Sequence, residues 1–168
     1  MQDAHTNLLA CIPRLRRYAR ALVGDRASAD DLVQDTMERG WNKLSSWQRD
    51  SDMRAWLFGI MHNLHVDQIR KPSVPTEVLD DDTPIPFVNA AQTDGLEIRD
   101  MESALRLLPA EQREILLLIA LEEMTYEEVA FTLRLPIGTV MSRLSRAREK
   151  LRALMEGRTV VSPLKVVK

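Results

Sequence analysis

Apolar residues recur at helical spacing through most of this chain. The first set forms one stripe, made of Leu8, Ile12, Leu15, Ala19 and Leu22. A period of about 3.6 residues predicts an amphipathic helix, and Gly24 is placed to end it. A second helix is predicted to begin with Ser28 as its N-cap. Its buried face would be made of Ala29, Leu32, Val33, Thr36, Gly40 and Leu44.

The opposite face of the second helix is acidic. Its members, at i, i+4, i+7 and i+11, are Asp31, Asp35, Glu38 and Asn42. A third helix is predicted over residues 54–71, ending before Pro72. Its apolar residues are Trp56, Leu57, Ile60, Met61 and Leu64. The first 71 residues are therefore predicted to form a small all-helical bundle.

The segment 72–96 interrupts the helical pattern. It contains Pro72, Pro75, Pro84 and Pro86 and an aspartate run at 80–82. Helix cannot continue through prolines at this spacing, and the alternation of a strand is missing. We interpret the segment as an extended linker between two helical domains. The alternative, a long loop within one domain, is less favoured because loops of this length are uncommon in compact folds.

Helical patterns resume in the second domain. Pro109 is placed to begin a helix, and the apolar run 115–121 predicts that this helix is buried on most sides. Thr125 and Glu128 have the spacing of a capping box, which predicts the start of a short helix. A turn containing Pro136 and Gly138 then leads into a basic helix. The predicted fold class is all-α.

The last two helices have the pattern of a helix-turn-helix, in which the second helix enters the DNA major groove. The apolar face of the basic helix is made of Val140, Leu144, Ala147, Leu151 and Leu154. Arginine and serine side chains occupy its other faces, and these can bind bases and phosphates. We interpret this helix as DNA-binding. The alternative is an ordinary solvated charged face.

Composition narrows the function classes. The net charge of the 168 residues is −2, but residues 72–100 carry −6 and each flank carries +2. A single cysteine excludes an internal disulfide. No stretch approaches the roughly 20 apolar residues that span a bilayer. The single cysteine and the lack of a membrane-spanning stretch lead us to expect a cytoplasmic protein. We find no glycine-rich phosphate loop and no nucleophile–base pair, so we expect that it is not an enzyme and needs no cofactor or metal.

Three stretches taken together resemble a known family. Residues 125–151, TYEEVAFTLRLPIGTVMSRLSRAREKL, are similar to the promoter-reading domain of extracytoplasmic-function (ECF) RNA polymerase sigma factors. Residues 29–44 resemble the helix that docks on core polymerase, and residues 54–71 resemble the helix that opens and reads the −10 element. The resemblance implies a sigma2-like domain (1–71), an acidic linker (72–96), a sigma4-like domain (97–158) and a tail (159–168).

The resemblance also implies a role for individual residues. Contacts with core polymerase are expected from Asp31, Gln34, Asp35 and Glu38. Contacts with the −10 element are expected from Gln48, Arg49, Asp50, Ser51, His62 and Asn63. Contacts with the −35 element are expected from Met141, Ser142, Arg143, Ser145 and Arg146. Asp67 and Arg70 also match family positions, although their spacing equally suits an ion pair within the helix.

The function implied is that of an alternative sigma factor. Its partners would be core RNA polymerase, promoter DNA and an anti-sigma factor, with no small-molecule substrate. One alternative is a sigma-like decoy that binds an anti-sigma protein without driving transcription. The other is a stand-alone helix-turn-helix repressor, which leaves residues 29–71 unexplained.

Overall fold

The computed structural model describes residues 2–70 and 94–157, with side chains described from residue 100 onward in the second part, and the regular elements described are all helical. They are α1 (Gln2–Ala10), α2 (Ile12–Val23), α3 (Arg26–Asn42), the short 3₁₀ helix η1 (Leu44–Ser46), α4 (Met53–Arg70), α5 (Asp94–Leu107), α6 (Ala110–Ala120), α7 (Tyr126–Leu133) and α8 (Ile137–Met155). The all-α prediction is confirmed. The predicted linker lies outside the described residues except for 94–96, which begin α5, and so does the tail 159–168.

The first predicted helix is two helices. The structure breaks it at Cys11, between α1 and α2. Pro13 in the first turn of α2 has no backbone N–H, so the hydrogen-bond ladder of α1 cannot continue through it. The prediction that Gly24 ends this segment is confirmed, because Gly24 adopts the left-handed conformation at φ +74°.

The start of α3 also differs from the prediction. Asp25, rather than Ser28, is the N-cap residue, and its carboxylate accepts hydrogen bonds from the Ser28 backbone N–H (2.9 Å) and hydroxyl (2.7 Å). Serine and aspartate both serve as N-cap residues, and in this helix the carboxylate of Asp25 is the capping group. In α4, Phe58 and His65 are buried, whereas Trp56 and Ile60 are only half-buried.

The helix-turn-helix is formed by α7 and α8. Thr125 and Glu128 make the predicted capping box at the start of α7. Helix α7 ends at Arg134, which begins the turn and adopts the left-handed conformation at φ 54°. Gly138, which was predicted to lie in the turn, is instead in the first turn of α8, where it has a negative φ and open space at the position of a Cβ.

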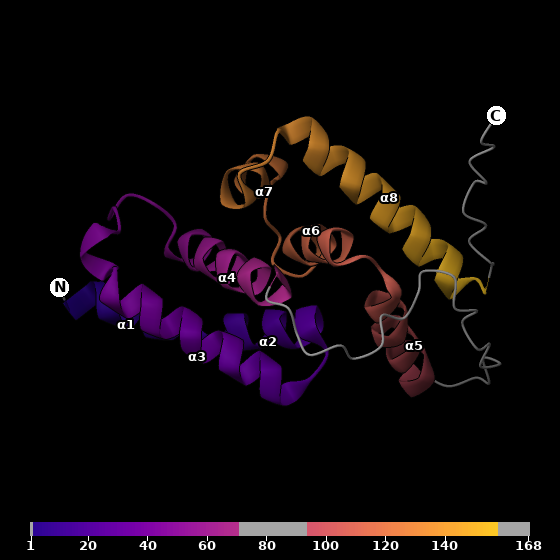
Figure 1. Cartoon of the computed structure of the whole chain (residues 1–168), viewed down its shortest axis with the longest axis horizontal. Coiled ribbons are helices and arrows are strands. Elements are labelled where there is room, and N and C mark those ends of the chain that lie inside the picture. Colours follow the sequence, from indigo (N-terminus) through magenta and orange to yellow (C-terminus); the bar gives the residue numbers. More distant parts are fainter. Residues whose placement is uncertain (1, 71–93, 158–168) are drawn as a thin grey trace.

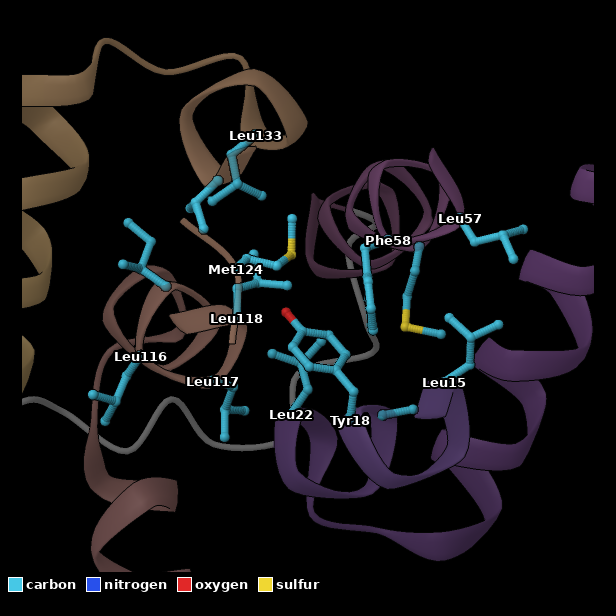
Figure 2. Packing of buried hydrophobic residues seen from close by; sticks show 14 of the residues in the cluster. Leu15, Tyr18, Leu22, Leu57, Phe58, Leu116, Leu117, Leu118, Met124 and Leu133 are labelled. Carbon is cyan, nitrogen blue, oxygen red and sulfur yellow. The ribbon is translucent and has the colours of Figure 1, made fainter. Parts of the chain in front are cut away.

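The two domains share one hydrophobic core. Helix α2 packs on α6, and α4 packs on α7, so segments separated by the linker lie side by side (Figure 1). Tyr18 and Phe58 meet edge to face at 4.8 Å, on the side of the N-terminal domain that faces Leu118 and Met124 (Figure 2). Helix α8 packs on α5, α6 and α7 and lies on the other side of the molecule from α3 (Figure 1).

Candidate polymerase and promoter interfaces

The residues predicted to contact polymerase form one exposed stripe on α3. Asp31, Gln34, Asp35 and Glu38 are all exposed, opposite the face that packs on α2 and α4. Asp35 and Glu38 also line a groove of about 740 Å³ whose other wall is the end of α4. We call these four residues the acidic stripe. It presents three carboxylates and one amide to a partner.

The loop before α4 carries four of the residues predicted to read the −10 element. Gln48, Arg49, Asp50 and Ser51 are all exposed. The loop turns at the Gln48 carbonyl, which accepts hydrogen bonds from the backbone N–H (2.9 Å) and hydroxyl (2.7 Å) of Ser51. Arg49 and Trp47 line a small cavity of about 200 Å³ against α1. The loop therefore has a defined turn with its polar side chains facing outward.

The two residues of α4 that are predicted to contact the −10 element have different surroundings. Asn63 is exposed. His62 instead points to the C-terminal domain, where its Nδ1 lies 2.6 Å from Oε1 of the buried Glu114 on α6. Asp67 and Arg70 are exposed and line the groove beside the acidic stripe.

Four of the residues predicted to read the −35 element lie on one exposed surface of α8. Met141, Ser142, Ser145 and Arg146 are exposed, whereas Val140, Leu144 and Ala147 are buried as the pattern predicted. The Ser142 hydroxyl donates to the Thr139 carbonyl at 3.1 Å, in the first turn of the helix. We call these four exposed residues the reading face.

Arg143 differs from the other four. Its guanidinium Nη2 lies 3.6 Å from the Glu111 carboxylate on α6, and its side chain is 30% exposed. This position is on the flank of α8, between the reading face and the core. Arg143 therefore ties α8 to α6 in this structure, a role that its position in the sequence did not reveal.

Sequence reasoning missed a charged cluster between the domains. Glu114 and Glu122 are both buried, and each contacts a basic residue of the N-terminal domain. Burial raises the pKa of the Tyr18 hydroxyl well above its usual value, and the two glutamates raise it further. Glu114 precedes the apolar run 115–121 and Glu122 follows it, so both resemble ordinary polar positions of an amphipathic helix. Only the contacts between the domains identify them.

His65 makes the stability of the protein sensitive to acid. Burial lowers its pKa, with Glu114 opposing this shift and His62 and Arg113 adding to it. Below the ordinary histidine pKa of about 6.5, the unfolded chain binds a proton that the folded chain resists. We therefore expect the free energy of unfolding to fall as the pH drops from 7.5 to 5.5.

Urea unfolding at the two pH values measures this effect. A His65→Gln variant keeps a polar side chain but loses the titration, so its stability should fall less between the two pH values. His5 and His62 are present in both proteins and act as an internal control. An equal decrease in wild type and variant would contradict the assignment.

Comparison with known proteins agrees with this architecture. Residues 8–62 match the family model described as the sigma2 domain of PhyR, and residues 98–151 match sigma-70 region 4. The chain is 38% identical to the ECF RNA polymerase sigma factor EcfG of Rhodopseudomonas palustris, over 89% of this chain and 83% of that protein. The chain belongs to the ECF family of RNA polymerase sigma factors. As an alternative sigma factor, it directs promoter-specific initiation of transcription.

Solved structures of other sigma factors have the same fold. The sigma factor resembles RpoE of Bartonella quintana, solved with the anti-sigma factor NepR, at 34% identity and a TM-score of 0.74, covering 93% of this chain and 98% of that one. It also resembles CnrH, solved with the cytosolic domain of CnrY, at 28% identity and a TM-score of 0.69, covering 94% and 90%. None of the helices that the structure describes is long and apolar enough to cross a membrane.

Proposed function

We propose that the acidic stripe of α3 docks this sigma factor on core RNA polymerase. Its three carboxylates are exposed, and those of Asp35 and Glu38 line the groove between α3 and the end of α4. A surface of this charge fits a basic partner surface, and complementary charge contributes both to association rate and to specificity. Asp67 and Arg70, on the other wall of the groove, would lie at the edge of the same contact.

Promoter DNA is assigned to two further surfaces. The loop 48–51 and Asn63 would contact the −10 element, and His62 would join them once it leaves Glu114. The reading face of α8 would contact the −35 element. The observation that supports this function most strongly is the reading face itself. It places polar and basic side chains, exposed, on the second helix of a helix-turn-helix, where that motif meets the major groove.

Regulation by an anti-sigma factor completes the proposal. RpoE, which shares this fold at 34% identity, was solved in complex with the anti-sigma factor NepR, and CnrH, at 28% identity, was solved with the cytosolic domain of CnrY. We place the sigma factor in the cytoplasm, where core polymerase and promoter DNA meet. It would act without catalysis of its own and without a cofactor, because polymerase supplies the chemistry.

A decoy for an anti-sigma factor is the second candidate. One observation favours it: residues 8–62 match a family model named for PhyR, and PhyR of Bartonella quintana is described as an anti-anti-sigma factor. The sequence identity to the protein in that PhyR structure is 20%, and the match covers 48% of its chain. The stronger resemblance to EcfG and RpoE favours the sigma factor.

Run-off transcription distinguishes the two candidates. Purified protein is added to core polymerase with a library of promoter fragments. The proposed function predicts transcripts that start downstream of one shared bipartite sequence and that are absent with core polymerase alone. Tight binding to an anti-sigma protein without promoter-specific transcripts would instead support the decoy.

A further inference from the structure

Two large apolar side chains are exposed at the start of α8, the helix that is assigned to DNA. Ile137 is 43% exposed and Met141 is 50% exposed, whereas Val140 and Leu144 of the same helix are buried. Residues four apart lie on the same side of an α-helix, with Cβ atoms about 5 to 6 Å apart. Ile137 and Met141 therefore form one exposed apolar surface, which we call the apolar pair. Met141 belongs to the reading face, and Ile137 extends it by one turn toward the start of α8.

The groups around the apolar pair are suited to a nucleic acid. Residues 137–148 contain three arginines and no acidic residue. Pro136 is the N-cap residue, and no side chain among the described residues caps the helix there. Gly138 has no atom within 4 Å of the position that a Cβ would take. The first amide groups of α8, with the positive end of its dipole, are thus open to a phosphate.

The place of the apolar pair in the helix-turn-helix determines which part of the DNA it meets. In this motif the N-terminal residues of the second helix contact base edges in the major groove. Most atoms of those edges are hydrogen-bond donors or acceptors, and an apolar side chain that removes water from them gives no hydrogen bond in return. One apolar group is also displayed there, the C5 methyl group of thymine. An exposed apolar surface at this position is therefore complementary to thymine methyl groups.

We propose that the apolar pair recognises thymine methyl groups in the −35 element. This inference deepens the proposed function and rests on it, because it assumes that α8 binds the −35 element. Successive bases of one strand are about 3.4 Å apart along the helix axis. Two side chains about 5 to 6 Å apart therefore reach methyl groups one or two base pairs apart.

The two members of the pair are suited to different parts of this contact. Methionine is unbranched and has a polarizable thioether, so Met141 can adjust its rotamer to the position of a methyl group. Isoleucine is β-branched and stiff at χ1, so Ile137 presents a fixed apolar shape. Met141 also lies next to Ser142 and one turn before Ser145, within the reading face. We therefore expect Met141 to contribute more to thymine recognition than Ile137.

Replacing thymidine with deoxyuridine tests the proposal, because it removes the methyl group and keeps the hydrogen bonds of the base pair. The −35 element found by run-off transcription is synthesised with uracil at each thymine in turn, on each strand. Binding of the complete holoenzyme to each fragment is measured in competition with the unmodified promoter. We expect uracil to weaken binding at one or two positions, by about fourfold for each contacted methyl group.

Alanine variants assign the contacted methyl groups to side chains. Met141→Ala and Ile137→Ala should each bind the unmodified promoter more weakly and lose the response to uracil at the position that the missing side chain contacts. Met155→Ala is the matched control. Met155 is 39% exposed on the same helix, about 21 Å further along its axis, so this variant should keep the full response to uracil. Thermal melting checks that the variants remain folded.

The outcomes separate this inference from the proposed function. A holoenzyme that transcribes the unmodified promoter but binds every uracil-substituted fragment equally well would overturn thymine recognition and leave the proposed function intact. A −35 element made only of G·C pairs would do the same. A full response to uracil in both alanine variants would show that the methyl group acts through DNA shape, and would overturn the role of the apolar pair. A folded protein without promoter-specific transcripts would overturn the proposed function itself.

Discussion

Replacing Asp35 with arginine is expected to weaken binding to core RNA polymerase by roughly a hundredfold, or about 3 kcal/mol, because like charges placed against each other across an interface cost several kcal/mol. Asp35 lies in the middle of the acidic stripe, exposed and on the wall of the groove shared with α4. The variant side chain would place a positive charge against the basic surface that we expect on polymerase. Titration of labelled sigma factor with core enzyme measures the change.

Asp30→Arg is the matched control. Asp30 is exposed on the same helix, but it lies about 100° around the helix axis from Asp31, beside the stripe rather than within it. The same charge change there should alter binding to core polymerase much less. Thermal melting of both variants checks that they remain folded. Equal losses of binding in the two variants would contradict the docking role of the stripe.

Replacing Arg146 with alanine is expected to relax sequence preference at one position of the −35 element, at a cost of about 1 to 3 kcal/mol. Arg146 is exposed on the reading face, and no hydrogen bond or ion pair holds its guanidinium within the residues that the structure describes. Arginine reads guanine through two hydrogen bonds to one base, so its loss removes discrimination at that base. Transcription from promoters that carry each base at each −35 position gives the measurement.

Two neighbouring arginines serve as controls for Arg146. Arg148 is exposed on the other flank of α8, where we expect it to contact phosphates. Arg148→Ala should therefore weaken all promoters about equally and reduce the salt dependence of binding. Arg143→Ala removes an ion pair with Glu111 and should lower the stability of the α6–α8 contact more than it alters base preference. An unchanged preference in Arg146→Ala would contradict its assignment as a base reader.

Local patterns in the sequence predicted most of the helices. The spacing of Thr125 and Glu128 predicted a capping box that the structure contains. On the predicted apolar face of α8, Val140, Leu144 and Ala147 are buried, whereas Leu151 and Leu154 are only half-buried. The errors were also local. Cys11 was placed inside one helix because the apolar stripe continues through it, although Pro13 prevents the backbone ladder from doing so.

The candidate surfaces were predicted unevenly. The acidic stripe and the reading face are exposed as expected, because residues that share one side of a helix are determined by spacing alone. His62 and Arg143 were expected to contact DNA in the same way, yet each faces a glutamate of α6 in the structure. Periodicity places a side chain on a face of its own helix, but it does not show which other helix covers that face.

The sequence by itself determined that this chain is helical, that it has two domains, and that one helix is suited to DNA. Hydrogen bonds four residues apart and apolar stripes are local properties, so a single sequence shows them. The tertiary structure alone decided how the domains meet. Glu122 reads as an ordinary acidic residue after an apolar run, and the arginine that pairs with it lies 105 positions earlier in the chain. Its burial depends on packing between distant segments, which no local pattern specifies.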